Sequence, residues 1–115
     1  MAEAGTTTGV GDVGGLRVET VTDGHVLRVA LHGECDFSKV PDLDQTLRSL
    51  ELTGSRVVYL DLTHLAFADV ATIRHLAAFA GHAKRAGQDV ATRGAHPTVR
   101  KVADLLQVHG ELGLS

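Results

Sequence analysis

Apolar and polar residues alternate in two short stretches near the start of the chain, at 16–19 and 26–31. Alternation with a period of two is typical of β-strands that bury one face. The residues Asp23 and Gly24 between the two stretches form an Asp-Gly pair, a strong signal for a tight hairpin turn. The sequence therefore predicts an antiparallel hairpin, which ends at Gly33.

A helical spacing follows the hairpin. Leu43, Leu47 and Leu50 recur at i, i+4 and i+7, which places them on one face of a helix, and Ser38 is the predicted N-cap. The nearly continuous apolar run at 57–62 then predicts a strand in the middle of the sheet, covered on both faces.

Two further helices and a strand complete the predicted order. A loop at 63–68 leads to Asp69 and a long helix that ends near Gly87, and residues 88–93 form a short strand. Pro97 opens a last helix, which Gly110 closes. The residues expected to face inward are Ile73, Leu76, Ala77 and Ala80 in the long helix and Val99, Val102, Leu105 and Leu106 in the last one.

This order predicts an α/β fold with a mixed, mostly parallel four-stranded sheet. The N-terminal hairpin is its antiparallel part, and the helices pack on the sheet. Because parallel strands end at the same edge, the loops at 34–38, 63–72 and 93–96 should lie together there. Residues 1–15 contain five of the thirteen glycines and are predicted to be a flexible tail, which leaves a single domain over 16–115.

Composition narrows the classes of function. The chain has 115 residues, 43% of them hydrophobic, and a formal net charge of -3. Without a basic stripe, a tryptophan or more than one tyrosine, nucleic acid is not an expected partner. No apolar run is long enough to cross a bilayer and no export signal opens the sequence, so we expect a cytoplasmic protein that does not contact a membrane.

Candidate catalytic and metal-binding residues form no recognisable motif. The seven histidines include no His-x-x-x-His pair, and the single cysteine rules out a Cys-x-x-Cys pair, so neither a metal nor another cofactor is expected. Cys35, Ser38 and Ser55 stand in no nucleophile elbow or glycine-rich loop. These patterns favour a binding module over an enzyme.

Three ordered motifs resemble those of the STAS domain family, over roughly residues 16–114. They are Gly-Glu-x-Asp at 33–36, the run from 58–62 through Phe-Ala-Asp at 67–69, and Pro-x-Val-Arg-x-Val at 97–102. The resemblance is to bacterial anti-sigma-factor antagonists. It implies a regulatory module that binds a protein partner, a kinase-type anti-sigma factor, in a partner-switching pathway that controls transcription.

The same resemblance implies an unusual switch. Those relatives carry a phosphorylated serine in an Asp-Ser-Ser-Gly motif, and the equivalent run here is Asp69-Val70-Ala71-Thr72, so Ala71 replaces the modified serine. The phosphorylation site is therefore degenerate, and Thr72, expected on the flank of its helix, is not a predicted substitute. The predicted partner-binding residues are Asp36, Ser38, Asp69, Val70, Ala71, Thr72 and His75.

Several alternatives stay open at this stage. The chain could sense a small ligand, or act as a scaffold within a larger signalling complex, and a homodimer is compatible with either role. Helical geometry places His75, Phe79 and His82 together, either as an exposed patch or with Phe79 packed under the first helix. The second arrangement is the one we favour.

Overall fold

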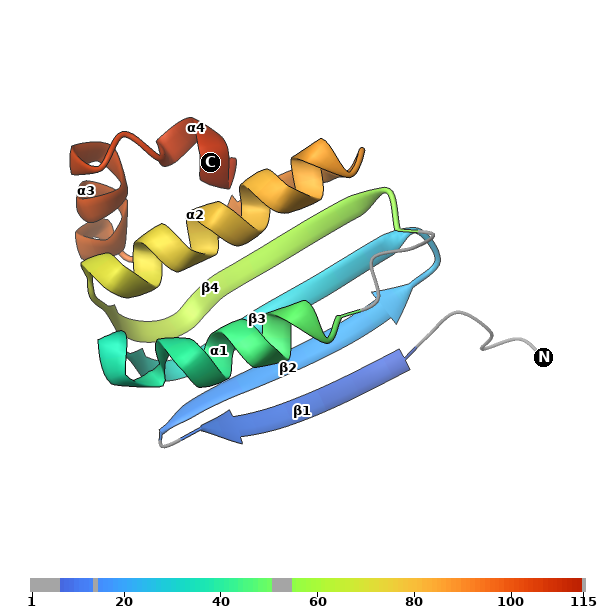
Figure 1. The fold of residues 1–115 in the computed structure, drawn as a ribbon, viewed down its shortest axis with the longest axis horizontal. Coiled ribbons are helices and arrows are strands. Elements are labelled where there is room, and N and C mark those ends of the chain that lie inside the picture. Colours follow the sequence, from blue (N-terminus) through green and yellow to red (C-terminus); the bar gives the residue numbers. More distant parts are fainter. Residues whose placement is uncertain (1–6, 14, 51–54, 115) are drawn as a thin grey trace.

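The computed structural model describes residues 7–13, 15–50 and 55–114, with side chains described from residue 15 onward. Figure 1 shows the order of the elements along the chain. The strands are β1 (Thr7–Val13), β2 (Leu16–Asp23), β3 (Val26–Cys35), β4 (Val57–Ala68) and β5 (Asp89–Arg93). The helices are the 3-10 turn η1 (Phe37–Lys39), α1 (Val40–Arg48), α2 (Val70–Arg85), α3 (Pro97–Leu105) and α4 (His109–Leu112).

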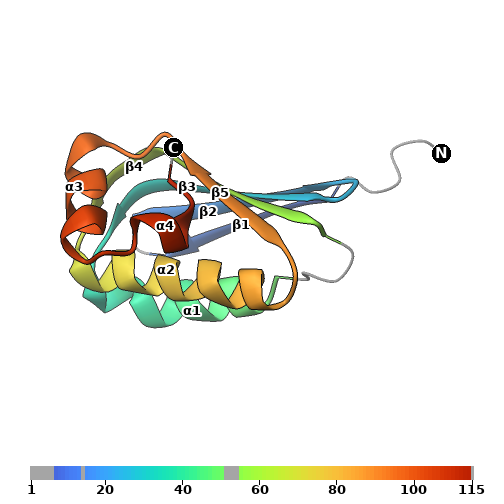
Figure 2. The same ribbon diagram turned by 90° about the horizontal axis from the view of Figure 1, so that it is seen from above.

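The strands form one mixed sheet in the order β1-β2-β3-β4-β5. Strands β2 and β3 form the antiparallel hairpin, which turns at Gly24 with a φ of +61°, and β3, β4 and β5 run parallel. Figure 2 shows α1 and α2 against one face of this sheet and α3 at its end. The predicted fold class, a mixed sheet with an N-terminal hairpin and packed helices, is confirmed.

Strand β1 is a fifth strand that the sequence did not predict. Residues 7–13 were expected in a flexible tail, but they pair antiparallel with β2 from Thr7 opposite Thr22 to Val13 opposite Leu16. Their glycines hide the strand signal, although four of the seven residues are threonine or valine, which favour strands. Gly15 of the predicted tail lies in the turn before β2, and residues 1–6 and 14 lie outside the described residues.

Strand β4 also differs from its prediction. It continues through 63–68, where a loop was expected, and only one of its faces is covered by helices. Tyr59 and Asp61 on the uncovered face are partly exposed. Tyr59 lies 4.9 Å beneath the guanidinium carbon of Arg28, and Asp61 accepts hydrogen bonds from Thr63. The apolar run at 57–62 therefore places large side chains on both faces of β4, although helices cover only one of them.

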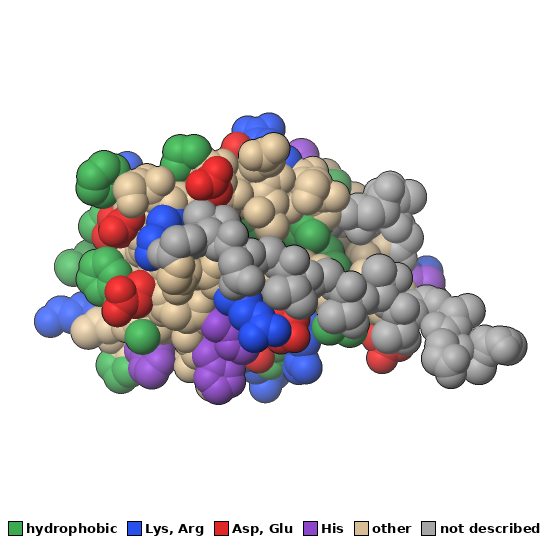
Figure 3. All heavy atoms as spheres, turned by 90° about the horizontal axis from the view of Figure 1, so that it is seen from below, with side chains coloured by type: hydrophobic (Ala, Val, Ile, Leu, Met, Phe, Trp, Pro, Cys, Tyr) green, Lys and Arg blue, Asp and Glu red, His purple; other side chains and the backbone are tan. Residues whose placement is uncertain are grey.

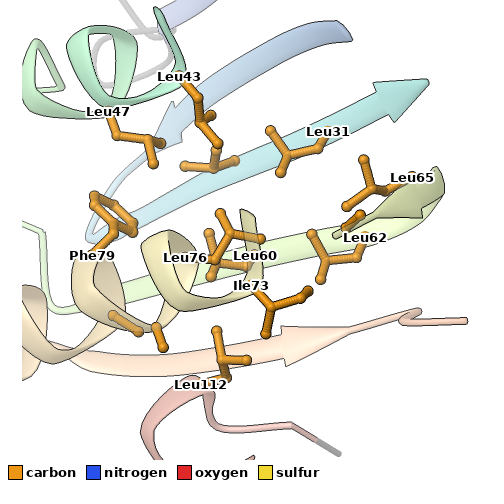
Figure 4. Close-up of a cluster of buried hydrophobic side chains, with 14 of the residues drawn as sticks. Leu31, Leu43, Leu47, Leu60, Leu62, Leu65, Ile73, Leu76, Phe79 and Leu112 are labelled. Atoms are coloured by element: carbon orange, nitrogen blue, oxygen red, sulfur yellow. The ribbon is translucent and has the colours of Figure 1, made fainter. Parts of the chain in front are cut away.

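The core lies between the helices and the covered face of the sheet. Figure 4 shows Leu43 and Leu47 of α1 above the sheet and Leu76 of α2 pointing toward Leu60 of β4. All four side chains are buried, and burying one leucine contributes about 2 kcal/mol. Phe79 is 9% exposed and lies on the α1 side of α2, so the prediction that it packs under the first helix is confirmed.

The C-terminal helix is divided, which corrects two predictions. Leu105, expected to face inward, ends α3 and is 75% exposed. The chain then turns at Gln107, whose φ is +60°, and continues as α4. Gly110 therefore lies inside α4 rather than closing a longer helix, and Gly113 takes the left-handed conformation of the C-cap.

Candidate docking rim

The start of α2 is tied to the turn after β3 by one carboxylate. Asp69 is the N-cap of α2, and its Oδ1 accepts a hydrogen bond from the Thr72 amide at 2.9 Å. Its Oδ2 accepts a second bond, from the amide of Phe37 at 2.8 Å. Residues separated by thirty-two positions in the sequence are therefore held together at the carboxyl end of the parallel strands.

The turn after β3 is closed by a second carboxylate. Asp36 is the N-cap of η1, and its Oδ1 accepts bonds from the Ser38 amide at 3.0 Å and the Ser38 hydroxyl at 2.5 Å. The predicted N-cap role of Ser38 is wrong, because Ser38 lies within η1 and Lys39 occupies the N-cap position of α1 without a side-chain bond. Ser38 is nevertheless exposed at this end of the molecule.

Thr72 does not lie on the flank of α2 as predicted. Its side chain is fully buried, and its Oγ1 lies 2.8 Å from Asp69 Oδ1 and 3.1 Å from the Cys35 carbonyl oxygen. Because it lies in the first turn of α2, beneath the link between η1 and α2, it faces β3 instead of solvent. Its hydroxyl group lies beneath the surface residues and connects the start of α2 to the end of β3 through the Cys35 carbonyl oxygen.

Large apolar side chains are exposed beside these carboxylates. Phe37 is 72% exposed, Phe67 50% and Val70 46%, three of the five large hydrophobic residues exposed in the described part of the chain. Figure 3 shows hydrophobic side chains gathered at the end of the molecule where Figure 1 places η1 and the start of α2. We define the docking rim by its surface residues: Asp36, Phe37, Ser38, Phe67, Asp69, Val70 and Ala71.

The pattern of charge at the rim follows from these bonds. The hydrogen bond from the Ser38 side chain holds the pKa of Asp36 below its ordinary value. For Asp69 burial raises the pKa, but the bonds from Thr72 and Phe37 outweigh it and leave the pKa lowered. Both carboxylates are therefore ionised near neutral pH. Burial raises the pKa of the Cys35 thiol, so that cysteine is a packed side chain and not a reactive thiolate.

His75, the last predicted site residue, lies about one helical turn beyond Ala71 of the rim. It lines a groove of about 820 Å³ between α1 and α2, together with Phe79 and His82. Its Nε2 lies 3.2 Å from Asp44 Oδ1 without the geometry of a hydrogen bond. The structure thus brings together Asp36, Ser38, Asp69, Val70 and Ala71, and places His75 in a neighbouring groove.

The described part of the chain contains neither a metal-binding cluster nor a membrane-spanning helix. Its His, Cys, Asp and Glu side chains form no group of three or more suited to a metal ion. The rings of His32 and His64 are stacked 5.0 Å apart on the open face of the sheet. Over the same residues, the helices fall short of the length and apolar character needed to cross a bilayer.

The exposed aromatic residues are what sequence reasoning missed. Phe37 and Phe67 were not predicted as site residues, because an isolated phenylalanine in a sequence usually indicates core. A signal was available: Phe37 directly follows Asp36 and Phe67 lies two residues before Asp69, in the segments expected at the carboxyl edge, where partners usually dock.

The architecture is a single-sheet α/β domain, and comparison with known proteins identifies the family. The family model described as "Mlab, STAS domain" matches residues 18–114. The chain therefore belongs to the STAS domain family. No curated protein matches it.

Solved structures share this fold at low sequence identity. An anti-sigma factor antagonist from Mycobacterium paratuberculosis is 23% identical with a TM-score of 0.65, over 95% of this chain and 84% of that one. The anti-sigma factor antagonist SpoIIAA in its unphosphorylated form is 14% identical with a TM-score of 0.64, over 95% and 88%. SLC26A9 is 17% identical with a TM-score of 0.59, over 79% of this chain but 17% of that larger protein.

Proposed function

We propose that this STAS domain is a protein-binding regulatory module that acts like an anti-sigma-factor antagonist in a bacterial cytoplasm. It binds its partner, a kinase-type anti-sigma factor, through the docking rim. Its action is binding rather than catalysis, and it needs no cofactor. The family assignment and the shared fold with antagonists support this role.

The exposed apolar residues of the rim are the observation that carries the proposal. Phe37, Phe67 and Val70 each leave about half or more of their surface in water. Such side chains are costly to leave solvated and serve as anchors when a partner covers them. Asp69 and Asp36 fix the backbone around Phe37, so little ordering entropy is lost on binding.

The chemistry of the rim also indicates which partner surface fits. Asp36 is ionised, and its Oδ1 accepts both the amide and the hydroxyl hydrogen bond of Ser38. A complementary partner would place an apolar patch over Phe37 and Val70 and a lysine or arginine next to Asp36.

In our proposal, the rim lacks the serine hydroxyl that is phosphorylated in related antagonists. Ala71 carries a methyl group where related antagonists carry the modified serine, and Thr72 is fully buried with its hydroxyl engaged. A kinase could reach the Thr72 hydroxyl only after the first turn of α2 had opened. We therefore infer that the module stays competent for binding when nucleoside triphosphate is present.

The proposal is tested by mixing the protein with candidate anti-sigma kinases, with and without ATP, and measuring complex and phosphate by native mass spectrometry. We expect a complex of unchanged mass per chain with ATP present. Phe37→Ala and Val70→Asp should each weaken it at least about tenfold, as anchor residues do. Val26→Asp is the matched control, since Val26 is 40% exposed at the opposite end of β3. Stoichiometric phosphorylation of a rim residue would contradict the unswitched role.

Ala71→Ser supplies a second test of the same surface. If the rim still fits an antagonist-type kinase, this variant should gain one phosphate and lose binding, because a phosphate dianion at a docking surface opposes an apolar partner. Failure of every candidate kinase to modify the variant would show that kinase recognition is lost.

The groove between α1 and α2 favours a second candidate function, the sensing of a small ligand. Its volume of about 820 Å³ is in the range of ligand sites, and Leu47, Phe79, His75 and Arg48 combine apolar walls with polar groups. Thermal shifts with nucleotides, simple anions and fatty acids test it. A rise in melting temperature that Ala78→Phe abolishes would support a ligand site, whereas unchanged melting with all three classes would exclude these ligands.

A further inference from the structure

The two outer strands of the sheet are protected to different degrees. At one edge, β5 has only five residues, and the C-terminal segment lies against it. The Thr92 amide donates to the Gly113 carbonyl oxygen at 3.0 Å, Thr92 forms a bridge with Leu114, and the Thr92 hydroxyl donates to the Leu112 carbonyl oxygen at 2.5 Å. The chain itself therefore covers this edge.

The opposite edge, β1, is open among the described residues. It has seven residues that all pair with β2 on one side, and its other side faces away from the sheet at the bottom of Figure 1. Edge strands usually carry lysine, proline or a bulge that prevents pairing with another strand. The sequence Thr-Thr-Gly-Val-Gly-Asp-Val contains no lysine or proline, and its register with β2 is unbroken.

We propose that β1 pairs antiparallel with β1 of a second copy of this chain, which joins two five-stranded sheets into one continuous sheet. A strand edge with unpaired amide and carbonyl groups can bind another strand through main-chain hydrogen bonds alone. A copy of the same strand suits this edge because antiparallel pairing about a two-fold axis is self-complementary.

The register of the proposed pair follows from the sequence. Full overlap of seven residues places the two-fold axis at the middle residue, Val10, so that each Val10 faces its own copy. Gly9 then faces Gly11, and Thr8 faces Asp12, which keeps the two aspartates apart. No like charges oppose each other in this register, whereas centring the pair on Asp12 would bring them together.

The dimer leaves the docking rims free. Strand β1 runs in the same direction as β3, because each is antiparallel to β2. The rim follows the end of β3, so antiparallel pairing of two β1 strands directs the two rims to opposite ends of the joined sheet. Such a dimer presents two separate docking ends and could hold two partner molecules at once.

Sedimentation velocity of the full chain over a wide concentration range tests the proposal without any partner. We expect the mass to rise with concentration from 12.1 kDa toward twice that value. Val10→Lys should raise the dimer dissociation constant at least about tenfold, since two like charges then meet at the axis. The substitution suits the fold itself, because residue 10 is paired with Glu19 of β2.

Val26→Lys is the matched control, an exposed valine on β3, which has neighbours on both sides. It should dimerise like the parent chain. A cysteine at position 10 provides an independent readout: oxidised glutathione should link Val10→Cys chains in pairs but not Val26→Cys chains. The parent chain reports any contribution from the buried Cys35.

Two results would overturn the proposal. One is a monomer at every concentration, with no cross-linking of Val10→Cys. The other is a dimer that Val10→Lys and Val26→Lys affect equally. Binding at the rim is measured separately, so loss of dimerisation and loss of the proposed regulatory function can be told apart.

Discussion

Asp69 connects the start of α2 to the turn after β3, so replacing it should loosen both. In Asp69→Ala the N-cap bond to Thr72 is lost, at a cost of about 1 kcal/mol. The long-range bond from the Phe37 amide is also lost, at about 1 kcal/mol more. Thr72 retains the Cys35 carbonyl oxygen as acceptor for its hydroxyl, so little is added there. The expected total is about 2 kcal/mol.

Urea unfolding measures this loss as a lower midpoint with an unchanged slope. A thermal scan should show a melting temperature lower by about 8 °C, from roughly 4 °C per kcal/mol for a domain of this size. Asp104→Ala removes an exposed aspartate of α3 and serves as the control, with a change below about 0.5 kcal/mol.

Amide hydrogen exchange distinguishes the two bonds. Asp69→Asn keeps an oxygen that can cap Thr72 but presents an amide donor toward Phe37, so only the Phe37 amide should lose protection. Asp69→Ala should expose both amides. The reasoning is refuted if Phe37 stays protected in both variants or if Asp69→Ala is as stable as the parent chain.

Three further predictions follow from the same geometry. Acidification below about pH 4 should destabilise the fold, because folding lowers the pKa values of Asp36, Asp61 and Asp69. As the pH falls, the unfolded chain therefore takes up protons before the folded chain does. A urea midpoint that rises between about pH 4 and about pH 2.5 would contradict this. Gly33→Ala should cost about 2 kcal/mol or more in urea unfolding, because Gly33 has a φ of +105° and a Cβ would collide with a neighbouring backbone carbonyl; a change below about 0.5 kcal/mol would refute it. Leu76→Ala removes a fully buried side chain and should cost about 2–5 kcal/mol by the same measurement, and a smaller loss would mean that the core repacks.

The order of the helices and strands could be predicted because each has its own local spacing of apolar residues. Leu43 and Leu47 mark the first helix, and the alternation around Val29 marks a strand with one buried face. Strand β1 could not be predicted, because its glycines are typical of a linker. Only its pairing with the neighbouring strand β2 identifies it as a strand. The predicted burial of Leu105 was wrong for a related reason. Leu105 has the expected helical spacing, but α3 ends there and the chain turns before α4 begins.

The rim was only partly predictable for a different reason. The segments around Asp36 and Asp69 were placed at one edge by strand order alone, but the bond from the Phe37 amide to Asp69 depends on the three-dimensional approach of two loops. The rotation of α2 decides that Thr72 faces β3, and the helical period fixes only relative positions around the axis. The burial of Thr72 therefore depends on how α2 packs against β3, which the sequence pattern does not specify.

The hydrogen bonding of the rim limits how it can be regulated. Both oxygens of Asp69 accept bonds from within the chain, and the Thr72 hydroxyl is buried beneath them, so no group at the start of α2 can be modified without breaking the N-cap. If the proposed binding role is correct, control comes from elsewhere than the start of α2: from the exposed Ser38 of the rim, from the partner's own state or concentration, or from pairing through β1.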